Sequence, residues 1–126
     1  PAPVMRGARE PTRFGLIHYG SSASSVAEAL VALEKRGVHL DVLRLRAFPF
    51  ADEVVDFVND HDQVFVVEQN RDAQMRTLLV NECGVDPARF VSVLHFDGTP
   101  ITARYIAAQV ASRLTALNAV PVEAMR

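Results

Sequence analysis

The feature that most constrains the fold of this chain is a regular alternation of short apolar runs with amphipathic segments. Four runs have the length and composition of buried strands. They lie at residues 14–19, 38–45, 63–67 and 90–94. Each is followed by a segment in which apolar residues recur at helical spacing. A strand–helix order repeated four times predicts an α/β fold with a mainly parallel sheet and helices on both faces.

Local sequence signals predict where the helices begin and end. Ser25 with Glu28 three residues later matches a capping box, so we expect the first helix to start at Ser25. Asn70 is a suitable N-cap for the third helix, and Gly84 suits its end. Pro100 or Thr102 opens the fourth helix. Its apolar face comprises Ile106, Val110, Leu114 and Leu117. The third helix should turn inward Met75, Leu78, Leu79 and Cys83.

Length and composition favour one domain of an ordinary globular protein. The chain has 126 residues, of which 49% are hydrophobic, and a formal net charge of −2. We expect an extended segment at 1–12 with a short edge strand at Val4–Arg6, a domain at 13–118 and a tail at 119–126. The absence of basic excess argues against nucleic acid as a partner. The apolar runs are too short for a membrane span, and the single cysteine precludes an internal disulfide.

Three loops follow the carboxyl ends of the expected strands, where ligands gather in open parallel sheets. The first contains Gly20, Ser21 and Ser22. A glycine turn followed by serines and free helix amides can hold an anion. Capping of the helix alone is the alternative interpretation. The nearby pair Arg44 and Arg46 also suits an anion, or is simply solvated.

The second loop carries Glu68, Gln69, Asn70 and Gln74 directly after an apolar strand. Glu68 is a candidate general acid or base, since burial raises the pKa of a carboxyl group. The alternative is an ion pair with an arginine, or polar contacts across a subunit interface. In the third loop His95 either titrates near neutral pH or is a packed or solvated side chain.

Metal ligation and nucleophilic catalysis lack supporting motifs. The four histidines are scattered, without a metal-ligand spacing. No GxSxG elbow is present, and Cys83 falls on an expected core stripe. The residues alone therefore indicate an α/β domain without a self-evident active site.

The loops together resemble a known family. Matching stretches are Gly20-Ser21-Ser22, the run Leu43–Phe50, Val66-Val67-Glu68-Gln69-Asn70 with Gln74 beyond it, and Asp97–Thr102. They are similar to the C-terminal domain of the alpha subunit of 2-oxoacid:ferredoxin oxidoreductases, especially the 2-oxoglutarate type. The family usually has glycine and leucine where this chain has Ala73 and Met75.

The resemblance implies a fold and a role. The fold, shared with the C-terminal domain of transketolase, is a three-layer sandwich around a mostly parallel five-stranded sheet with one antiparallel edge strand. The complete complex carries out oxidative decarboxylation of a 2-oxoacid with coenzyme A, and uses thiamine diphosphate, Mg and an iron–sulfur cluster. This chain lacks the cysteines of such a cluster. The resemblance therefore implies a non-catalytic domain whose cofactors are bound elsewhere in the complex.

The partners implied are a beta subunit, other domains of the alpha subunit and, through the complex, ferredoxin, in the cytoplasm. Interface contacts are expected from Glu68, Gln69, Asn70 and Gln74. The loop at Gly20–Ser22 is expected to contact a partner or an anion, since a regulatory-ligand site has been suggested in the related transketolase domain. The start at Pro1 rather than Met suggests a piece of a longer protein.

Two other hypotheses compete with this interpretation. The chain is a free-standing module for a small anion or nucleotide if the loop at residue 20 is its binding site. It is a small hydrolase if Glu68 or His95 acts on a substrate. Fold analogy alone is a weak guide to function, so the three need separate tests.

Overall fold

The computed structural model of the protein describes residues 4–6, 13–20, 23–45, 52–95 and 99–116. Its strands are β1 (Val4–Arg6), β2 (Phe14–Tyr19), β3 (Asp41–Leu45), β4 (Gln63–Glu68) and β5 (Phe90–Leu94). Its helices are α1 (Ala23–Glu34), α2 (Asp52–Asn59), α3 (Gln74–Cys83) and α4 (Ala103–Ala116), with a short 3-10 turn, η2 (Pro87–Arg89). No helix in these ranges is both long and apolar enough to cross a membrane.

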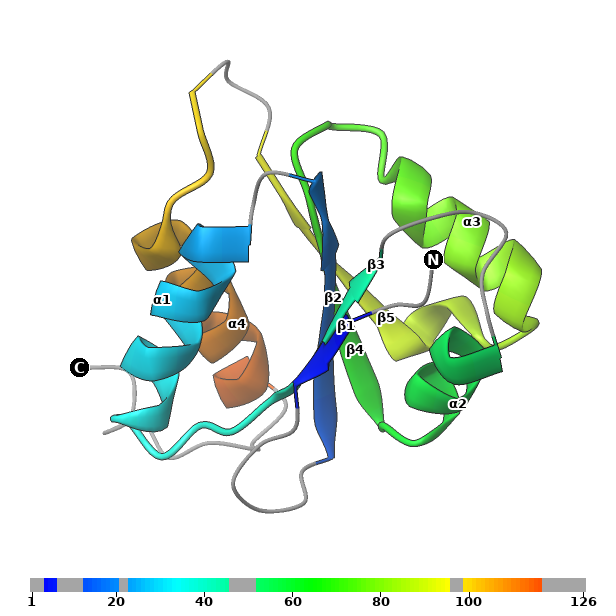
Figure 1. The fold of residues 1–126 in the computed structure, drawn as a ribbon, viewed down its shortest axis with the longest axis horizontal. Helices are drawn as coiled ribbons and strands as arrows, with labels where there is room; N and C mark the ends of the chain where they lie inside the picture. Colours follow the sequence, from blue (N-terminus) through cyan, green and yellow to red (C-terminus); the bar gives the residue numbers. More distant parts are fainter. Residues whose placement is uncertain (1–3, 7–12, 21–22, 46–51, 96–98, 117–126) are drawn as a thin grey trace.

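The strands form one sheet in the order β1-β3-β2-β4-β5. The four strands from β2 to β5 run parallel, and β1 pairs antiparallel with β3 through Val4 and Arg44. Helices α1 and α4 cover one face of the sheet and α2 and α3 the other (Figure 1). The predicted α/β class, with a parallel sheet flanked by helices, is confirmed. β1 lies where the sequence predicts a short edge strand.

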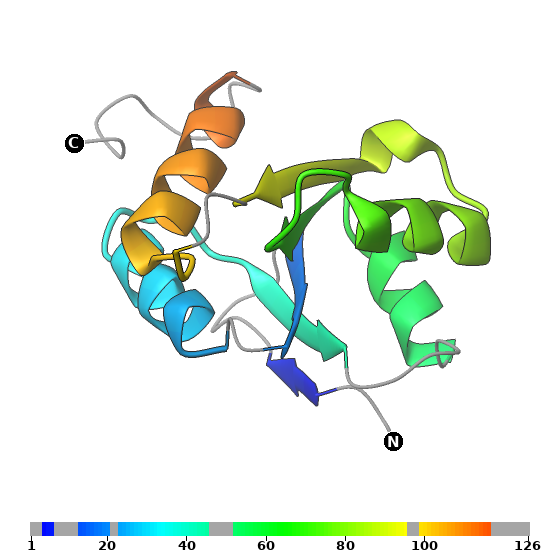
Figure 2. The same ribbon diagram turned by 90° about the horizontal axis from the view of Figure 1, so that it is seen from above.

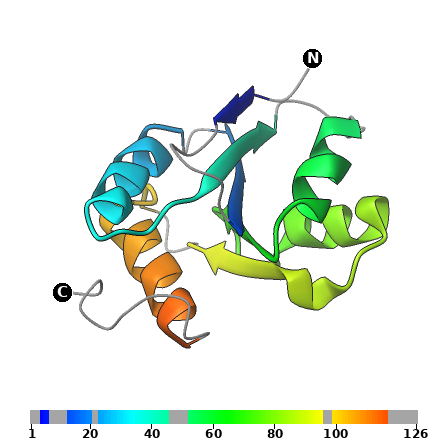
Figure 3. The same ribbon diagram turned by 90° about the horizontal axis from the view of Figure 1, so that it is seen from below.

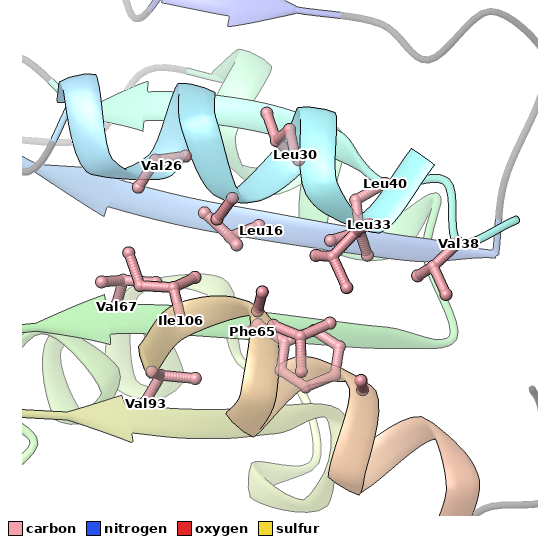
Figure 4. Close-up of a cluster of buried hydrophobic side chains, with 14 of the residues drawn as sticks. Leu16, Val26, Leu30, Leu33, Val38, Leu40, Phe65, Val67, Val93 and Ile106 are labelled. Carbon is pink, nitrogen blue, oxygen red and sulfur yellow. The ribbon is translucent and has the colours of Figure 1, made fainter. Parts of the chain in front are cut away.

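Two apolar cores lie on the two faces of the sheet, because successive side chains of a strand point to opposite sides. Leu16 packs under α1 and α4, whereas its neighbour Ile17 packs under α2 and α3. Figure 4 shows Leu16 of β2 and Phe65 of β4 together with residues of α1 and α4 in the first core. In the sequence, Val42 and Leu43 fall on opposite faces of the strand expected at 38–45, which predicts this two-sided burial. The structure confirms it, although β3 starts at Asp41 rather than at residue 38.

The two helices over the first core illustrate a wrong and a correct prediction of a helix start. α1 begins at Ala23, so the capping box expected at Ser25 is wrong. The Ser25 hydroxyl donates instead to the Ile101 carbonyl at 2.8 Å and ties α1 to the segment before α4. The Thr102 hydroxyl accepts from the Tyr105 amide at 3.1 Å, so Thr102, one of the two predicted starts of α4, caps the helix.

The third helix packs less deeply than the sequence predicts. Leu79 is fully buried in the second core, but Leu78 is 40% exposed, so the prediction that Leu78 faces inward is wrong. Met75 and Cys83, one turn before and after Leu79, pack against the same core. Val80 also packs against this core beside Leu79, so the contact stripe of α3 is wider at that turn, and Leu78 lies at its margin.

A polar cluster that the sequence did not suggest lies at the amino end of the sheet. Figure 3 views the fold from this end. His61 is 4% exposed. Its Nδ1 lies 2.6 Å from the Phe57 carbonyl oxygen and its Nε2 lies 2.7 Å from Oδ2 of Asp41. The Arg89 guanidinium donates to the His61 carbonyl. These contacts join α2, β3 and η2.

Gly15 lets this cluster pack against the sheet. A Cβ added at Gly15 would lie 2.8 Å from Cε1 of Phe57 and 3.2 Å from Cγ of His61. The ring centroids of Phe57 and His61 are themselves 4.4 Å apart. The absence of a side chain at Gly15 therefore makes room for both rings.

Candidate functional site

The three loops singled out in the sequence leave the same edge of the sheet, at the carboxyl ends of β2, β4 and β5. Figure 2 looks down on this edge. β2 and β4 are neighbours in the sheet, but β2 leads into α1 on one face and β4 leads into α3 on the other. Connections that diverge from adjacent parallel strands mark the topological switch point, where ligands of open α/β sheets bind.

Glu68, the last residue of β4, is 1% exposed. Its Oε1 accepts the Met75 amide at 2.7 Å, and its Oε2 accepts the Arg76 amide at 3.1 Å. Oε1 also accepts from Nδ2 of Asn70 at 3.1 Å. The carboxylate thus caps the first turn of α3, where free amides and the helix dipole favour a negative charge. This use of both oxygens does not favour a general acid or base role.

Asn70 is not the N-cap of α3, so that prediction is wrong. Its amide nitrogen donates to Glu68 and, at 3.4 Å, to the Tyr19 hydroxyl. Its Oδ1 accepts the Asp72 amide at 3.1 Å in a local turn. Burial and the Glu68 carboxylate raise the pKa of Tyr19. Asn70 therefore links the ends of β2 and β4 through their side chains.

The residue that precedes α3 is strained. Ala73 has φ 51° and ψ 45°, in the left-handed region. A side chain in that region costs about 1–2 kcal/mol relative to the right-handed one, a cost that glycine avoids. This turn brings the amides of Met75 and Arg76 to Glu68. Gln69 and Gln74, on either side of the turn, are exposed.

At the first loop, Gly20 follows β2 with φ 71°, and its carbonyl accepts from Nη2 of Arg44 at 3.4 Å. Ser21, Ser22 and Arg46 lie outside the described residues. His18, two residues before Gly20, is 4% exposed. Burial, and next the nearby Arg44 charge, lower the pKa of His18 from 6.5 to about 4, so its ring is neutral at physiological pH.

His95 at the third loop does not meet Glu68 through its side chain. Its ring lies edge-on to Tyr105, with centroids 5.2 Å apart. The Tyr105 hydroxyl donates to the Leu94 carbonyl at 2.6 Å. His95 is two residues beyond Val93 and so is on the α4 side, whereas Glu68 caps α3 on the other side. The two groups named in the hydrolase hypothesis therefore lie on opposite faces.

No three His, Cys, Asp or Glu side chains gather as a metal site within the described ranges. Cys83 is half-buried, and burial together with the Glu82 charge raises the pKa of its thiol. A thiol with a raised pKa is a weaker nucleophile at neutral pH, because the thiolate is the reactive form.

Sequence reasoning missed His18 and Tyr19 at this edge, and the His61–Asp41 pair at the opposite one. The alternation within β2 could have indicated that His18 is buried, since it lies two residues after Leu16 on the same face. The His61–Asp41 pair spans 20 residues and has no motif that announces it.

Solved structures show where this fold occurs. The chain is similar to a 2-oxoglutarate:ferredoxin oxidoreductase from Magnetococcus marinus solved with 2-oxoglutarate, coenzyme A and succinyl-CoA bound. The TM-score is 0.79 and the identity 20%, over 90% of this chain and 20% of the other. It is also similar to the alpha chain of a probable 2-oxoacid ferredoxin oxidoreductase from Thermoplasma acidophilum, with TM-score 0.60 and 23% identity over 90% of this chain and 97% of that one.

A third similar structure is a split-gene transketolase, described as an inactive beta4 tetramer. Its TM-score is 0.68 and its identity 20%, over 84% of this chain and 39% of the other. No protein-family model and no curated protein matches the sequence. The similarities establish a transketolase C-terminal-like fold, and this chain spans a fifth of the oxidoreductase chain from Magnetococcus marinus.

Proposed function

We propose that the chain is the C-terminal structural and interface domain of the alpha subunit of a 2-oxoacid:ferredoxin oxidoreductase of the 2-oxoglutarate type. The observation that carries this proposal is the agreement of the fold with such an oxidoreductase over 90% of the chain. The stretches Val66–Asn70 and Asp97–Thr102, which resemble the family in sequence, add independent support.

On this proposal the complete cytoplasmic complex converts a 2-oxoacid and coenzyme A to an acyl-CoA and CO₂, and reduces ferredoxin. An iron–sulfur cluster requires several cysteine ligands, and this chain has one cysteine. The described residues likewise offer no group that fits Mg. The cluster and thiamine diphosphate would therefore be bound by other domains or by the beta subunit.

The polar residues of the second loop fall into two groups, those that make contacts within the domain and those that are exposed. Glu68 and Asn70 act inside the domain, where they hold α3 and the end of β2 to β4. Gln69 and Gln74 are exposed on either side of the strained turn. We assign contacts with the beta subunit to these two glutamines, because they are the exposed members of the motif that resembles the family.

The test is reconstitution with a beta subunit of a 2-oxoacid:ferredoxin oxidoreductase. The chain and the beta subunit should elute as one complex from a sizing column. The chain alone should give no 2-oxoglutarate-dependent reduction of ferredoxin, since it lacks the cofactor ligands. Turnover by the chain alone, or separate elution of the two proteins, would contradict the proposal.

A double variant, Gln69→Ala with Gln74→Ala, locates the interface. It should weaken the complex by about tenfold, which is the loss of one or two hydrogen bonds. The matched control is Gln109→Ala, a glutamine on the exposed side of α4. If Gln109→Ala weakens the complex as much as the double variant does, the interface with the beta subunit does not lie at this loop.

A further inference from the structure

The turn between β4 and α3 is held in a strained conformation. Among the described residues Ala73 is the only non-glycine residue with a positive φ, at 51°. An alanine is about tenfold less populated in this left-handed region than in the right-handed one. Strained residues persist where the surrounding structure holds them, and they cluster at binding segments. Contacts from the rest of the domain must therefore offset the preference of Ala73.

The Glu68 carboxylate supplies these contacts, because one of its oxygens joins the two sides of the turn. Oε1 accepts from Nδ2 of Asn70 at 3.1 Å and from the Met75 amide at 2.7 Å. Oε2 accepts from the Arg76 amide at 3.1 Å. The residue is 1% exposed, so water competes little for these hydrogen bonds. The carboxylate therefore ties the residue three places before Ala73 to those just after it.

Side chains also fix the backbone on either side of Ala73. The Ala73 carbonyl accepts from the Thr77 amide at 3.0 Å and from the Thr77 hydroxyl at 3.1 Å. On the other side, Oδ1 of Asn70 accepts from the Asp72 amide at 3.1 Å. A rotation of residue 73 to the right-handed region would move Asn70 relative to the first turn of α3. The two sides would then no longer share the Glu68 oxygen.

The held conformation fixes the relative positions of two exposed side chains. Gln69 directly follows Glu68, Gln74 directly follows Ala73, and both glutamines are exposed. The backbone between them is the segment that the Glu68 carboxylate closes. A segment that is ordered before binding loses less conformational entropy when a partner binds. The strain at Ala73 therefore suits a preformed binding turn.

We propose that Glu68 is a positioning residue, whose carboxylate keeps Ala73 left-handed and so holds Gln69 and Gln74 in the arrangement that the beta subunit binds. This inference rests on the proposed subunit assignment, which makes the two glutamines part of the interface. Without the carboxylate the strained turn becomes a minor conformation. The apparent affinity for the partner then falls in proportion to the population of the competent turn.

The first experiment measures the dissociation constant of the complex with a beta subunit by calorimetry. Glu68→Gln keeps the size of the side chain but replaces one acceptor oxygen with an NH₂ group, which accepts no amide. It should weaken the complex by about tenfold, the left-handed penalty of alanine. Glu68→Gln combined with Ala73→Gly should weaken it by only about twofold, because glycine adopts positive φ as readily as negative φ. This rescue by glycine separates positioning from a general loss of stability.

The second experiment uses the free chain and needs no partner. In the isotope-labelled chain, the NOE between the amide and Hα protons of residue 73 is strong at positive φ, because the two protons then lie close together. It should be strong in the natural chain and weak in Glu68→Gln. The matched control is Asp86→Asn, since the exposed Asp86 carboxylate caps η2 by accepting from the Ala88 amide at 2.9 Å. This control should leave both the NOE and the affinity unchanged.

Ala73→Val tests the same turn with Glu68 intact, and so decides the question if Glu68→Gln does not fold. A β-branched side chain is disfavoured at positive φ more strongly than alanine. The variant should lose the strong NOE and weaken the complex by about tenfold or more.

Failure of this inference is distinct from failure of the subunit assignment. If Glu68→Gln folds, keeps the strong NOE and binds the beta subunit like the natural chain, Glu68 does not position the turn. Equal weakening by Glu68→Gln with and without Ala73→Gly also overturns the positioning role, because it indicates a general loss of stability. A natural chain that does not bind the beta subunit overturns the subunit assignment, whereas the NOE in the free chain still decides whether Glu68 holds Ala73.

Discussion

A buried histidine lies at each end of the sheet, and the two differ in the hydrogen-bond partners of their ring nitrogens. At the amino end both ring nitrogens of His61 face acceptors, the Phe57 carbonyl and the Asp41 carboxylate. At the carboxyl end Nδ1 of His18 has no partner among the described residues. His61 and His18 are equally buried, each with 4% exposure. The two side chains are therefore buried to the same extent, and they differ in whether their ring nitrogens have hydrogen-bond partners.

The same contrast extends to the backbone. The amino end packs Phe57 and His61 closely over Gly15. The carboxyl end contains Ala73 in the left-handed region as well as the unpaired His18. Strain and unpaired polar atoms persist where they serve a purpose other than stability. Buried atoms without a partner also occur near the amino end, at Oε1 of Gln63 and Nε of Arg89, so the contrast concerns the two histidines rather than the two ends as wholes.

Lowering the pH should cause the largest change in the free energy of unfolding, through His18 at the carboxyl end of the sheet. The pKa of His18 is lowered in the folded protein from 6.5 to about 4, so the unfolded chain binds the extra proton first as the pH falls. The contribution of the neutral His18 ring to stability is fully present above pH 6.5. The free energy of unfolding should fall by up to about 3 kcal/mol as the pH drops to about 4. Urea unfolding across this range measures the loss.

His18→Leu is the control for that loss, because it removes the titrating group and keeps a side chain of similar size. The variant should lose less stability than the natural chain over the same range. If the two curves of unfolding free energy against pH run parallel, the unpaired histidine is not the group responsible.

The next effect concerns the amino end. His61→Ala removes the side-chain partner of Asp41 and of the Phe57 carbonyl, together with the ring packed on Phe57. We expect a loss of about 2 kcal/mol or more in the free energy of unfolding at neutral pH. Urea denaturation gives the value directly.

His18→Leu at neutral pH provides the matched measurement at the other end. It removes a neutral, unpaired ring, so we expect stability to stay the same or to rise slightly. If His18→Leu lowers the free energy of unfolding as much as His61→Ala does, the two histidines do not differ in their contribution to stability.

The smallest effect concerns the strained turn. Ala73→Gly should stabilise the protein by about 1 kcal/mol, since glycine adopts φ 51° without strain. Ala108→Gly, at an exposed position within α4, should instead destabilise it by about 1 kcal/mol. Thermal unfolding of the two variants compares them. The same sign of change in both would show that Ala73 is not strained.

The sequence was most informative where structure depends on neighbours in the chain. The alternation of Val42 and Leu43 between two cores, the start of α4 at Thr102 and the stop of α3 at Gly84 all follow from local periodicity and capping chemistry. The cap of α3 does not follow from such local signals, because the group that accepts its first free amides is Glu68 in the preceding strand rather than the residue next to the helix. For the same reason Asn70 was assigned a role that Glu68 fills.

The sequence by itself determined the α/β class, the order of the elements and the two apolar faces, since these depend on residue periods of 2 and 3.6. It also singled out the residues at the carboxyl ends of the strands. Only the tertiary structure decided which polar groups meet at each end of the sheet. The register of β2 with β3 places His18 beside Arg44, and the fold of α2 places His61 against Asp41. Pairings between distant segments are set by strand register and helix packing, which no local pattern encodes.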